Sequence, residues 1–282
     1  MKPDRPSATA RRVAIQRAAH QILDEHRVLD DPVAVPILGG QAVEARVREK
    51  ERKFRHPFAV GLRAFLVARS RCAEDALAKA VEAGIEQYVV LGAGLDTFAY
   101  RNPFPRLRVF EVDYPSTQEW KRGLLARARI TPPPSLTYVP VDFETQTLAD
   151  RLRESGLRAD QPAFFSWLGV TMYLTREVVL ANLRFVAECP PGSGITFDYF
   201  VPPGELPWFA RLVWQLVAWR VALHGEPWRT WFRPADLADE LRRMGFTALE
   251  DLDGPALNAR YFGGRLRALG GRNNARVMTA VR

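Results

Sequence analysis

The chain has 282 residues, 47% of them hydrophobic, which is enough to bury a full hydrophobic core. Its two cysteines, Cys72 and Cys189, exclude a disulfide framework, and its four histidines lack close ligand spacing, so we expect no bound metal. The formal net charge is +8, but the basic residues are scattered among acids and form no nucleic-acid-binding motif, so we expect no nucleic-acid partner.

The N-terminal segment is charged and lacks the apolar core of a secretory signal. The longest apolar run, residues 206–223, is interrupted by Arg211 and Arg220 and is shorter than a membrane span of about 20 residues. We therefore expect a cytoplasmic protein without stable membrane insertion, either a monomer or a homodimer.

Two helical segments are predicted ahead of the first strand. Apolar residues recur at helical spacing over residues 8–28, and a second helical block spans residues 57–84 and ends at Gly84, a residue type common at helix C-caps. A break marked by proline and glycine, DDPVAVPILGG, separates the two. We interpret residues 1–84 as a helical cap packed on a core formed by residues 85–282.

From residue 86 onward, short runs rich in β-forming residues alternate with helical runs. The strand candidates are EQYVVL (86–91), LRVFEV (107–112), LTYVPV (136–141), AFFSW (163–167), GITFDY (194–199), FTALEDL (246–252) and ARVMTAV (275–281). Helical runs between most of them are typical of a parallel sheet with helices on both faces. The last two candidates have no predicted helix between them, which indicates an antiparallel edge. The predicted fold class is α/β, with a seven-stranded, mostly parallel, doubly wound sheet and a helical lid insertion at residues 203–224.

The first strand candidate runs into a glycine turn, VVLGAGLDTFAYR, of the kind that lays backbone against a nucleotide. Gly92 and Gly94 allow a sharp turn and a close approach to a ligand. Where a dinucleotide-binding fingerprint has its third glycine, this chain has Thr97, preceded by Asp96. A carboxylate is unfavourable beside a pyrophosphate and favourable beside a cationic ligand, which counts against a dinucleotide.

Acidic residues follow the next two strand candidates. Asp113 lies 113 − 92 = 21 residues after Gly92, where a carboxylate accepts hydrogen bonds from ribose hydroxyls in either cofactor class. Glu111 points to the same side of the strand but deeper, and we rank it lower. Asp142 and Phe143 lie at the exit of the third candidate, where an acid accepts from the adenine amino group and an aromatic ring packs on the base. The combination favours S-adenosylmethionine over a dinucleotide.

The motifs ARSRCAEDAL, YVVLGAGLDTFAYR, FEVDYP, VPVDFE and WLGVTMYLT occur in this order. The stretch from Phe65 to Tyr199 that contains them resembles the leucine carboxyl methyltransferase family, in particular its bacterial members of unassigned substrate. The resemblance implies a class I methyltransferase fold that uses S-adenosylmethionine. It also implies that an arginine on the helix before the first strand binds the methionine carboxylate; Arg71 is the best match and Arg69 the alternative.

The resemblance assigns the other cofactor contacts to matching positions. They are Gly92 and Gly94 in the cofactor loop, Asp113 at the ribose, and Asp142 with Phe143 at the adenine. Before the MYL segment the family often has an acid that helps to hold the methionine amino group, but this chain has Leu168. The ammonium group then depends on backbone carbonyls around Gly92 or Trp167, or on Asp96. Tyr173 keeps the family's aromatic position, and we expect it to face the sulfonium.

The expected reaction is methyl transfer to the carboxylate of a small, largely apolar acceptor, as the resemblance implies. A carboxylate is already ionised and needs no general base, and the sequence has no clear Ser-His-Asp arrangement. No catalytic residue is assigned; the candidates are Tyr173 and His56. The residues expected in the substrate pocket are Tyr173, Tyr199, Trp208 and Trp214.

Three alternatives stay open. The acceptor atom could be an acidic hydroxyl of a secondary metabolite. The protein could be an NAD(P)-dependent oxidoreductase, against which Thr97 and Asp142 count. It could also be a noncatalytic S-adenosylmethionine-binding protein, for which Leu168 is the argument.

Overall fold

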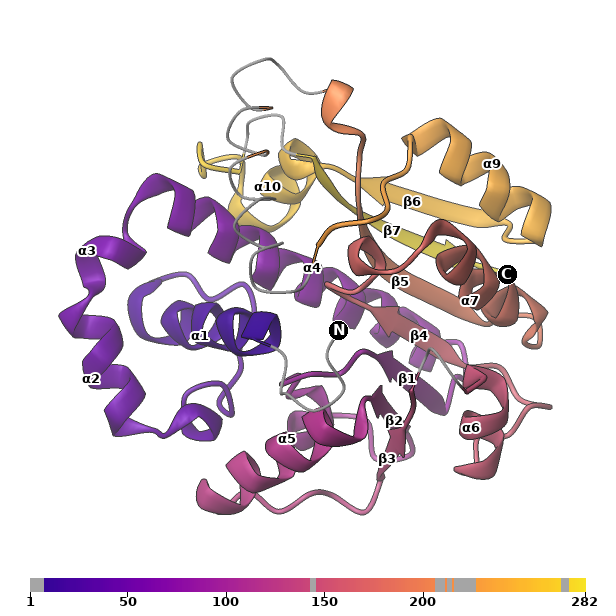
Figure 1. The fold of residues 1–282 in the computed structure, drawn as a ribbon, viewed down its shortest axis with the longest axis horizontal. Coiled ribbons are helices and arrows are strands. Elements are labelled where there is room, and N and C mark those ends of the chain that lie inside the picture. The colour runs from indigo at the N-terminus through magenta and orange to yellow at the C-terminus, as the bar shows by residue number, and fades with distance from the viewer. Residues whose placement is uncertain (1–7, 143–145, 206–210, 212–214, 216–226, 270–273) are drawn as a thin grey trace.

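Seven strands form one sheet in a computed structural model of the protein, which describes residues 8–142, 146–205, 211, 215, 227–269 and 274–282 (Figure 1). The strands are β1 (Gln87–Leu91), β2 (Arg108–Asp113), β3 (Leu136–Pro140), β4 (Phe164–Trp167), β5 (Gly194–Phe200), β6 (Ala248–Leu252) and β7 (Ala275–Val281). Their order across the sheet is β3-β2-β1-β4-β5-β7-β6. All seven predicted strands are confirmed. The strand order reverses between β1 and β4, and such a switch point is where open α/β sheets bind ligands.

The antiparallel strand of the sheet is β7, which pairs antiparallel with both β5 and β6. The predicted antiparallel pair at the edge of the sheet is therefore confirmed, with β6 outermost and β7 between β6 and β5. A helix that the sequence pattern does not predict, α10 (Gly254–Phe262), lies between β6 and β7. Its Gly-Pro start resembles a turn, but Asp253 caps the helix by accepting a hydrogen bond from Ala256 N at 2.9 Å.

Helices cover both faces of the sheet (Figure 1). They are α4 (Pro57–Glu82), α5 (Pro115–Arg127), α6 (Leu148–Glu154), α7 (Arg176–Glu188) and α9 (Pro234–Met244), together with α10. On one face, Leu152 of α6 and Leu183 of α7 pack in the same core as Val89. On the other, Leu77 of α4 packs with Tyr88. Because neighbouring side chains of a strand point to opposite faces, β1 contributes to both cores, and the predicted doubly wound sheet is confirmed.

Three shorter helices precede α4. They are α1 (Ala8–Leu23), α2 (Gln41–Glu49) and α3 (Glu51–Phe54). The first is five residues shorter than predicted, and α2 and α3 follow the break marked by proline and glycine, where no helix is predicted. α1 packs on α4 and on α2. It thereby lies near the carboxyl edge of the sheet, where it meets the site described below (Figure 1).

The predicted insertion at residues 203–224 lies outside the described residues, apart from residues 203–205, 211 and 215. The lid and the division of the chain at residue 84 therefore stay predictions. None of the described helices combines the length and the apolar character that crossing a membrane requires.

Candidate functional site

A cavity of about 440 Å³ lies at the carboxyl ends of β1, β2 and β4. Its lining comes from the loops after these strands, at residues 92–96, 113–114 and 168–170, and from α1 and α4. The α1 residues on the cavity are Thr9, Ala10, Val13, Ala14 and Arg17. This is the place where the strand order predicts a ligand site.

The glycine turn after β1 requires both of its glycines. Gly92 has φ 65° and Gly94 has φ 49°, a backbone region that residues with a side chain rarely adopt. A Cβ atom on Gly92 would collide with Val170, and one on Gly94 would lie 3.1 Å from the Cβ of Ala10. The turn therefore lets both the β4 loop and helix α1 approach the cavity floor closely.

Asp113, at the end of β2, lines the cavity and braces the glycine turn. Its Oδ2 accepts a hydrogen bond from Gly94 N at 2.5 Å, and its Oδ1 accepts one from Tyr114 N at 2.7 Å. Burial raises the pKa of this carboxyl despite these two bonds. Asp113 thus lies where the sequence places the ribose acid, beside the backbone of the turn.

Glu111 occupies a different place. It is buried and accepts a hydrogen bond from Lys121 Nζ at 2.6 Å, and it does not line the cavity. Burial raises the pKa of Glu111 to about 7, which the nearby ammonium group only partly offsets. The Glu111–Lys121 pair therefore belongs to the core next to the site, in agreement with the lower rank of Glu111 as a candidate ribose acid.

The two candidate arginines of α4 differ sharply in position. Arg69 is buried and lines the cavity, where its Nη1 donates to Asp198 Oδ2 at 2.5 Å. A Cβ atom on Gly169 would lie 2.8 Å from its Nη2, so the guanidinium packs against the β4 loop. Arg71 does not line the cavity; its side chain is half-exposed and its Nε donates to Asp75. The structure therefore places Arg69 at the cavity in place of the preferred candidate, Arg71. The side chains of two residues that are two positions apart on a helix point about 200° apart around its axis, so only one of them can face the cavity.

The sequence also matches a known protein family. The family profile described as leucine carboxyl methyltransferase matches residues 10–187, which contain most of α1, the glycine turn, Asp113 and Arg69. The chain belongs to the leucine carboxyl methyltransferase family. Since the match begins at residue 10, inside α1, most of this cavity-lining helix is part of the region that the family model describes.

This family member has similar curated relatives. It is 31% identical over 294 positions to a Bacillus subtilis protein named "Putative S-adenosyl-L-methionine-dependent methyltransferase YktD", with 94% of each chain covered. It is 33% identical over 205 positions to a Mycobacterium avium protein named "Putative S-adenosyl-L-methionine-dependent methyltransferase", with 69% of this chain and 66% of that one covered.

Two solved structures share its fold. A DUF574 family protein from Streptomyces avermitilis superimposes with a TM-score of 0.55 at 22% identity, covering 87% of this chain and 94% of that one. A structure titled as a "putative methyltransferase" from Thermobifida fusca gives a TM-score of 0.54 at 18% identity, covering 88% and 92%. The class I methyltransferase fold is thus confirmed for this leucine carboxyl methyltransferase family member.

The adenine residues are only partly described. Asp142 follows β3 and is half-buried, and its backbone N donates to Gln146 Oε1 at 3.0 Å. It is not among the residues that line the cavity. Phe143 lies outside the described residues, so the adenine contacts of both stay a prediction.

The residues around β4 and β5 divide between cavity and core. Tyr173 and Leu168 line the cavity. Trp167 is fully buried with its indole in the core and does not line the cavity. Tyr199 is also in the core, and its hydroxyl donates to Asp251 Oδ2 at 2.8 Å. The prediction that Tyr199 lines the substrate pocket is therefore wrong. Side chains alternate along β5, and it is the preceding residue, Asp198, whose carboxylate reaches Arg69 at the cavity.

The remaining predicted residues lie away from the cavity or outside the described chain. His56 is the exposed N-cap of α4, where its Nδ1 accepts from Phe58 N at 3.3 Å, so it is not placed to act as a base. Trp208 and Trp214 lie outside the described residues. No group of three or more metal-ligating side chains occurs among the residues that the structure describes.

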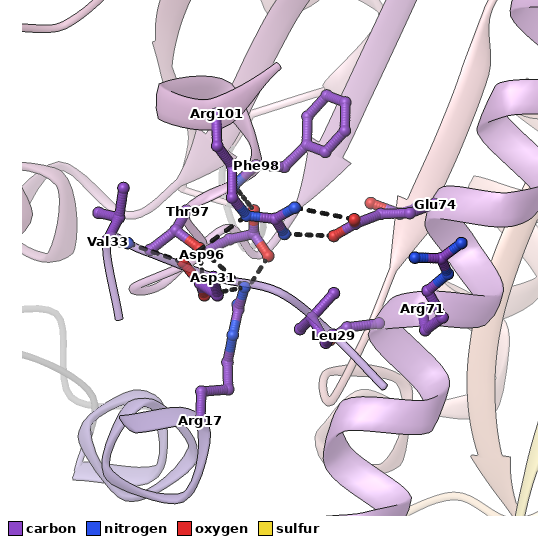
Figure 2. A network of polar contacts seen from close by, with 12 residues as sticks. Arg17, Leu29, Asp31, Val33, Arg71, Glu74, Asp96, Thr97, Phe98 and Arg101 are labelled. Carbon is purple, nitrogen blue, oxygen red and sulfur yellow. Dashed lines mark hydrogen bonds and ion pairs between the residues drawn. The ribbon is translucent and has the colours of Figure 1, made fainter. Parts of the chain in front are cut away.

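A polar network that the sequence analysis missed joins α1 to the glycine turn (Figure 2). Arg17 of α1 donates to Asp31, Asp96 and Thr97, and Arg101 pairs with Glu74 of α4. The signal in the sequence is an arginine followed by two alanines in a helical stretch, Ala18 and Ala19, both of which the structure shows to be fully buried. Such a residue must find partners inside the protein.

Proposed function

We propose that this protein, an S-adenosylmethionine-dependent methyltransferase by its family, transfers the methyl group to a carboxylate oxygen of a small, largely apolar acceptor. One observation carries the choice of a carboxylate. The described residues that line the cavity include no histidine, cysteine or lysine, and their carboxylates are engaged with arginines or backbone N–H groups. A described lining whose carboxylates already have hydrogen-bonding partners suits an acceptor that is itself ionised.

The residues of the cavity fit the cofactor. The glycine turn offers a cradle that a side chain would fill, and Asp113 lies beside it to accept from ribose hydroxyls. Arg69 supplies the cation for the methionine carboxylate, since it is the arginine of α4 that reaches the cavity. The family resemblance adds Asp142 and Phe143 for the adenine. When bound, S-adenosylmethionine supplies an electrophilic methyl group on its sulfonium.

Other residues of the cavity suit an amphipathic acceptor. Leu174, Val178 and Pro227 provide apolar surface, and Tyr173 adds an aromatic ring. Arg229 also lines the cavity. The apolar wall and the cation together favour a molecule with an apolar body and a carboxylate.

Arg229 differs from the other cations of the cavity. Arg17 and Arg69 are both paired with carboxylates. Arg229 makes a backbone hydrogen bond to Met172 O, and its guanidinium has no carboxylate partner within the described residues. It is therefore available to orient an anionic acceptor.

The protein's own contribution to catalysis is alignment. Direct displacement requires the acceptor oxygen in line with the methyl carbon and the sulfur, and holding the reactants in such geometry is worth about 7–11 kcal/mol. Arg229 orients the carboxylate, while the apolar wall removes water from it and so makes it a stronger nucleophile. No proton has to be moved in this step.

The test is the chemical stability of the product. Purified protein is incubated with methyl-labelled S-adenosylmethionine and with matched sets of medium-chain or arylalkanoic acids, their alcohols and their amides. A carboxyl methyl ester releases labelled methanol in mild alkali. We expect such labelled product with the acids and not with the matched alcohols or amides. Base-stable label would show hydroxyl methylation instead. Binding of the cofactor without turnover, even in a metabolite extract, would favour the noncatalytic alternative raised by Leu168.

A further inference from the structure

The network around Arg17 connects the N-terminal helix to the cofactor loop. Arg17 Nη2 donates to Asp31 Oδ2 and to Thr97 Oγ1, both at 2.8 Å, and its Nη1 donates to Asp96 Oδ2 at 3.1 Å. Thr97 Oγ1 in turn donates to Asp31 Oδ2 at 2.7 Å. Arg17, Asp31 and Thr97 are all buried. The loop after β1 is thereby held by a side chain from α1.

The charges of this network do not cancel. Arg101 donates through both Nη atoms to the carboxylate of Glu74, and its Nε lies 3.6 Å from Asp31 Oδ1. Two guanidinium groups, Arg17 and Arg101, therefore face three carboxylates, those of Asp31, Glu74 and Asp96. The sum is 2 − 3 = −1. A charge left over in such a site is costly unless a cation compensates it.

Asp96 presents this excess charge to the cavity. It lines the cavity, and 22% of its side chain is exposed, whereas Asp31 is fully buried. Its Oδ1 accepts from Phe98 N at 2.8 Å. Burial opposes ionisation and is the largest single effect, but the positive charges of Arg17, Lys121 and Arg101 together outweigh it, so the pKa of Asp96 is held below its ordinary value. The carboxylate is thus ionised, fixed in place and open to a ligand.

The cavity has the charge pattern of an amino-acid zwitterion. Arg69 packs against the loop after β4, and Asp96 lies in the loop after β1, the neighbouring strand. Both line the same cavity. Leu168 lines it too, at the position where the family often has an acid for the methionine amino group. A negative charge is therefore missing on the β4 loop and present on the β1 loop.

We propose that Asp96, positioned by Arg17 of α1, is the counter-charge of the methionine ammonium group of the cofactor and takes the place of the acid that Leu168 replaces. This inference rests on the proposed function, because it assumes that S-adenosylmethionine binds. It gives α1 a role in cofactor affinity beyond covering the cavity, since Arg17 fixes the carboxylate that meets the ligand.

The test compares ligands with and without the amino-acid part, by calorimetry with the full chain. Asp96→Asn keeps an oxygen for Phe98 N but removes the charge. We expect it to weaken S-adenosylhomocysteine at least about tenfold, or about 1.4 kcal/mol. Methylthioadenosine, which lacks the amino acid, should bind unchanged. Leu168→Glu in the Asp96→Asn background should restore the affinity for S-adenosylhomocysteine.

Other outcomes distinguish the possible failures. If Asp96→Asn weakens the binding of S-adenosylhomocysteine and of methylthioadenosine equally, Asp96 acts only on the shape of the loop and the proposal is overturned. The proposal is also overturned if Glu74→Gln selectively weakens S-adenosylhomocysteine binding and Asp96→Asn does not. If Asp96→Asn does not fold, the wild-type protein is tested with the analogue of S-adenosylhomocysteine in which hydrogen replaces the α-amino group. That analogue should bind at least about tenfold more weakly, and equal affinity would refute a counter-charge. If wild type binds neither S-adenosylhomocysteine nor methylthioadenosine, the proposed function itself fails.

Discussion

Arg69 and Arg71 form a matched pair, because they are two residues apart on one helix and only Arg69 reaches the cavity. We predict that Arg69→Gln weakens S-adenosylhomocysteine binding at least about tenfold, the loss typical of one charge-assisted hydrogen bond. Arg71→Gln should leave this affinity unchanged. The same two variants should differ in stability, since their ion pairs differ in burial.

The expected magnitudes follow from that burial. The side chains of Arg69 and Asp198 are 7% and 1% exposed, and removing one partner of such a pair costs about 3–5 kcal/mol. With an unfolding entropy of about 2.1 cal/mol/K per residue over 282 residues, Tm should fall by about 5–8 °C. The Arg71–Asp75 pair is 47% and 36% exposed and is worth at most about 1 kcal/mol, so Tm should change by less than about 2 °C.

Thermal melts and calorimetry measure the two effects separately. Asp198→Asn is the control, because it should lower stability while leaving Arg69 free to bind a carboxylate. The double variant Arg69→Gln/Asp198→Asn should recover stability without recovering affinity. Equal losses in Arg69→Gln and Arg71→Gln, or a larger loss of affinity in Arg71→Gln, would refute the assignment of the cavity cation.

Three further predictions concern other parts of the site. Asp113→Ala should weaken both S-adenosylhomocysteine and methylthioadenosine at least about tenfold by calorimetry, since both contain the ribose; unchanged binding would remove Asp113 from the site. The pKa of Glu111 is raised to about 7, so the folded state binds an extra proton between the unfolded pKa and pH 7, and stability should fall as pH rises through this window. Denaturant unfolding should show that decline, on the order of 3 kcal/mol, in wild type and lose it in Glu111→Gln; parallel curves would contradict it. Arg229→Gln should raise the KM for an acid acceptor with the Kd of S-adenosylhomocysteine unchanged, and Arg229→Lys should recover part of the loss; a changed Kd would place Arg229 at the cofactor instead.

The sequence by itself determined the strands and the edge of the sheet where the site lies. Alternation of apolar runs with helical runs predicts the parallel sheet, and the carboxyl ends of parallel strands meet at one edge. Gly92, Gly94 and Asp113 follow directly from strand exits, so their proximity is a local consequence of the pattern. These features depend on short stretches of chain, which is why they could be read without coordinates.

Only the tertiary structure decided which side chains reach the cavity. The sequence favours Arg71 over Arg69 as the cofactor-binding arginine, and the phase of α4 against the sheet brings Arg69 to the cavity instead. Tyr199 is directed into the core by the alternation of β5, whose facing the sequence does not specify. Arg17 and Asp96 are 79 residues apart and meet because α1 packs over the glycine turn, a contact set by the burial of whole helices that no local pattern contains.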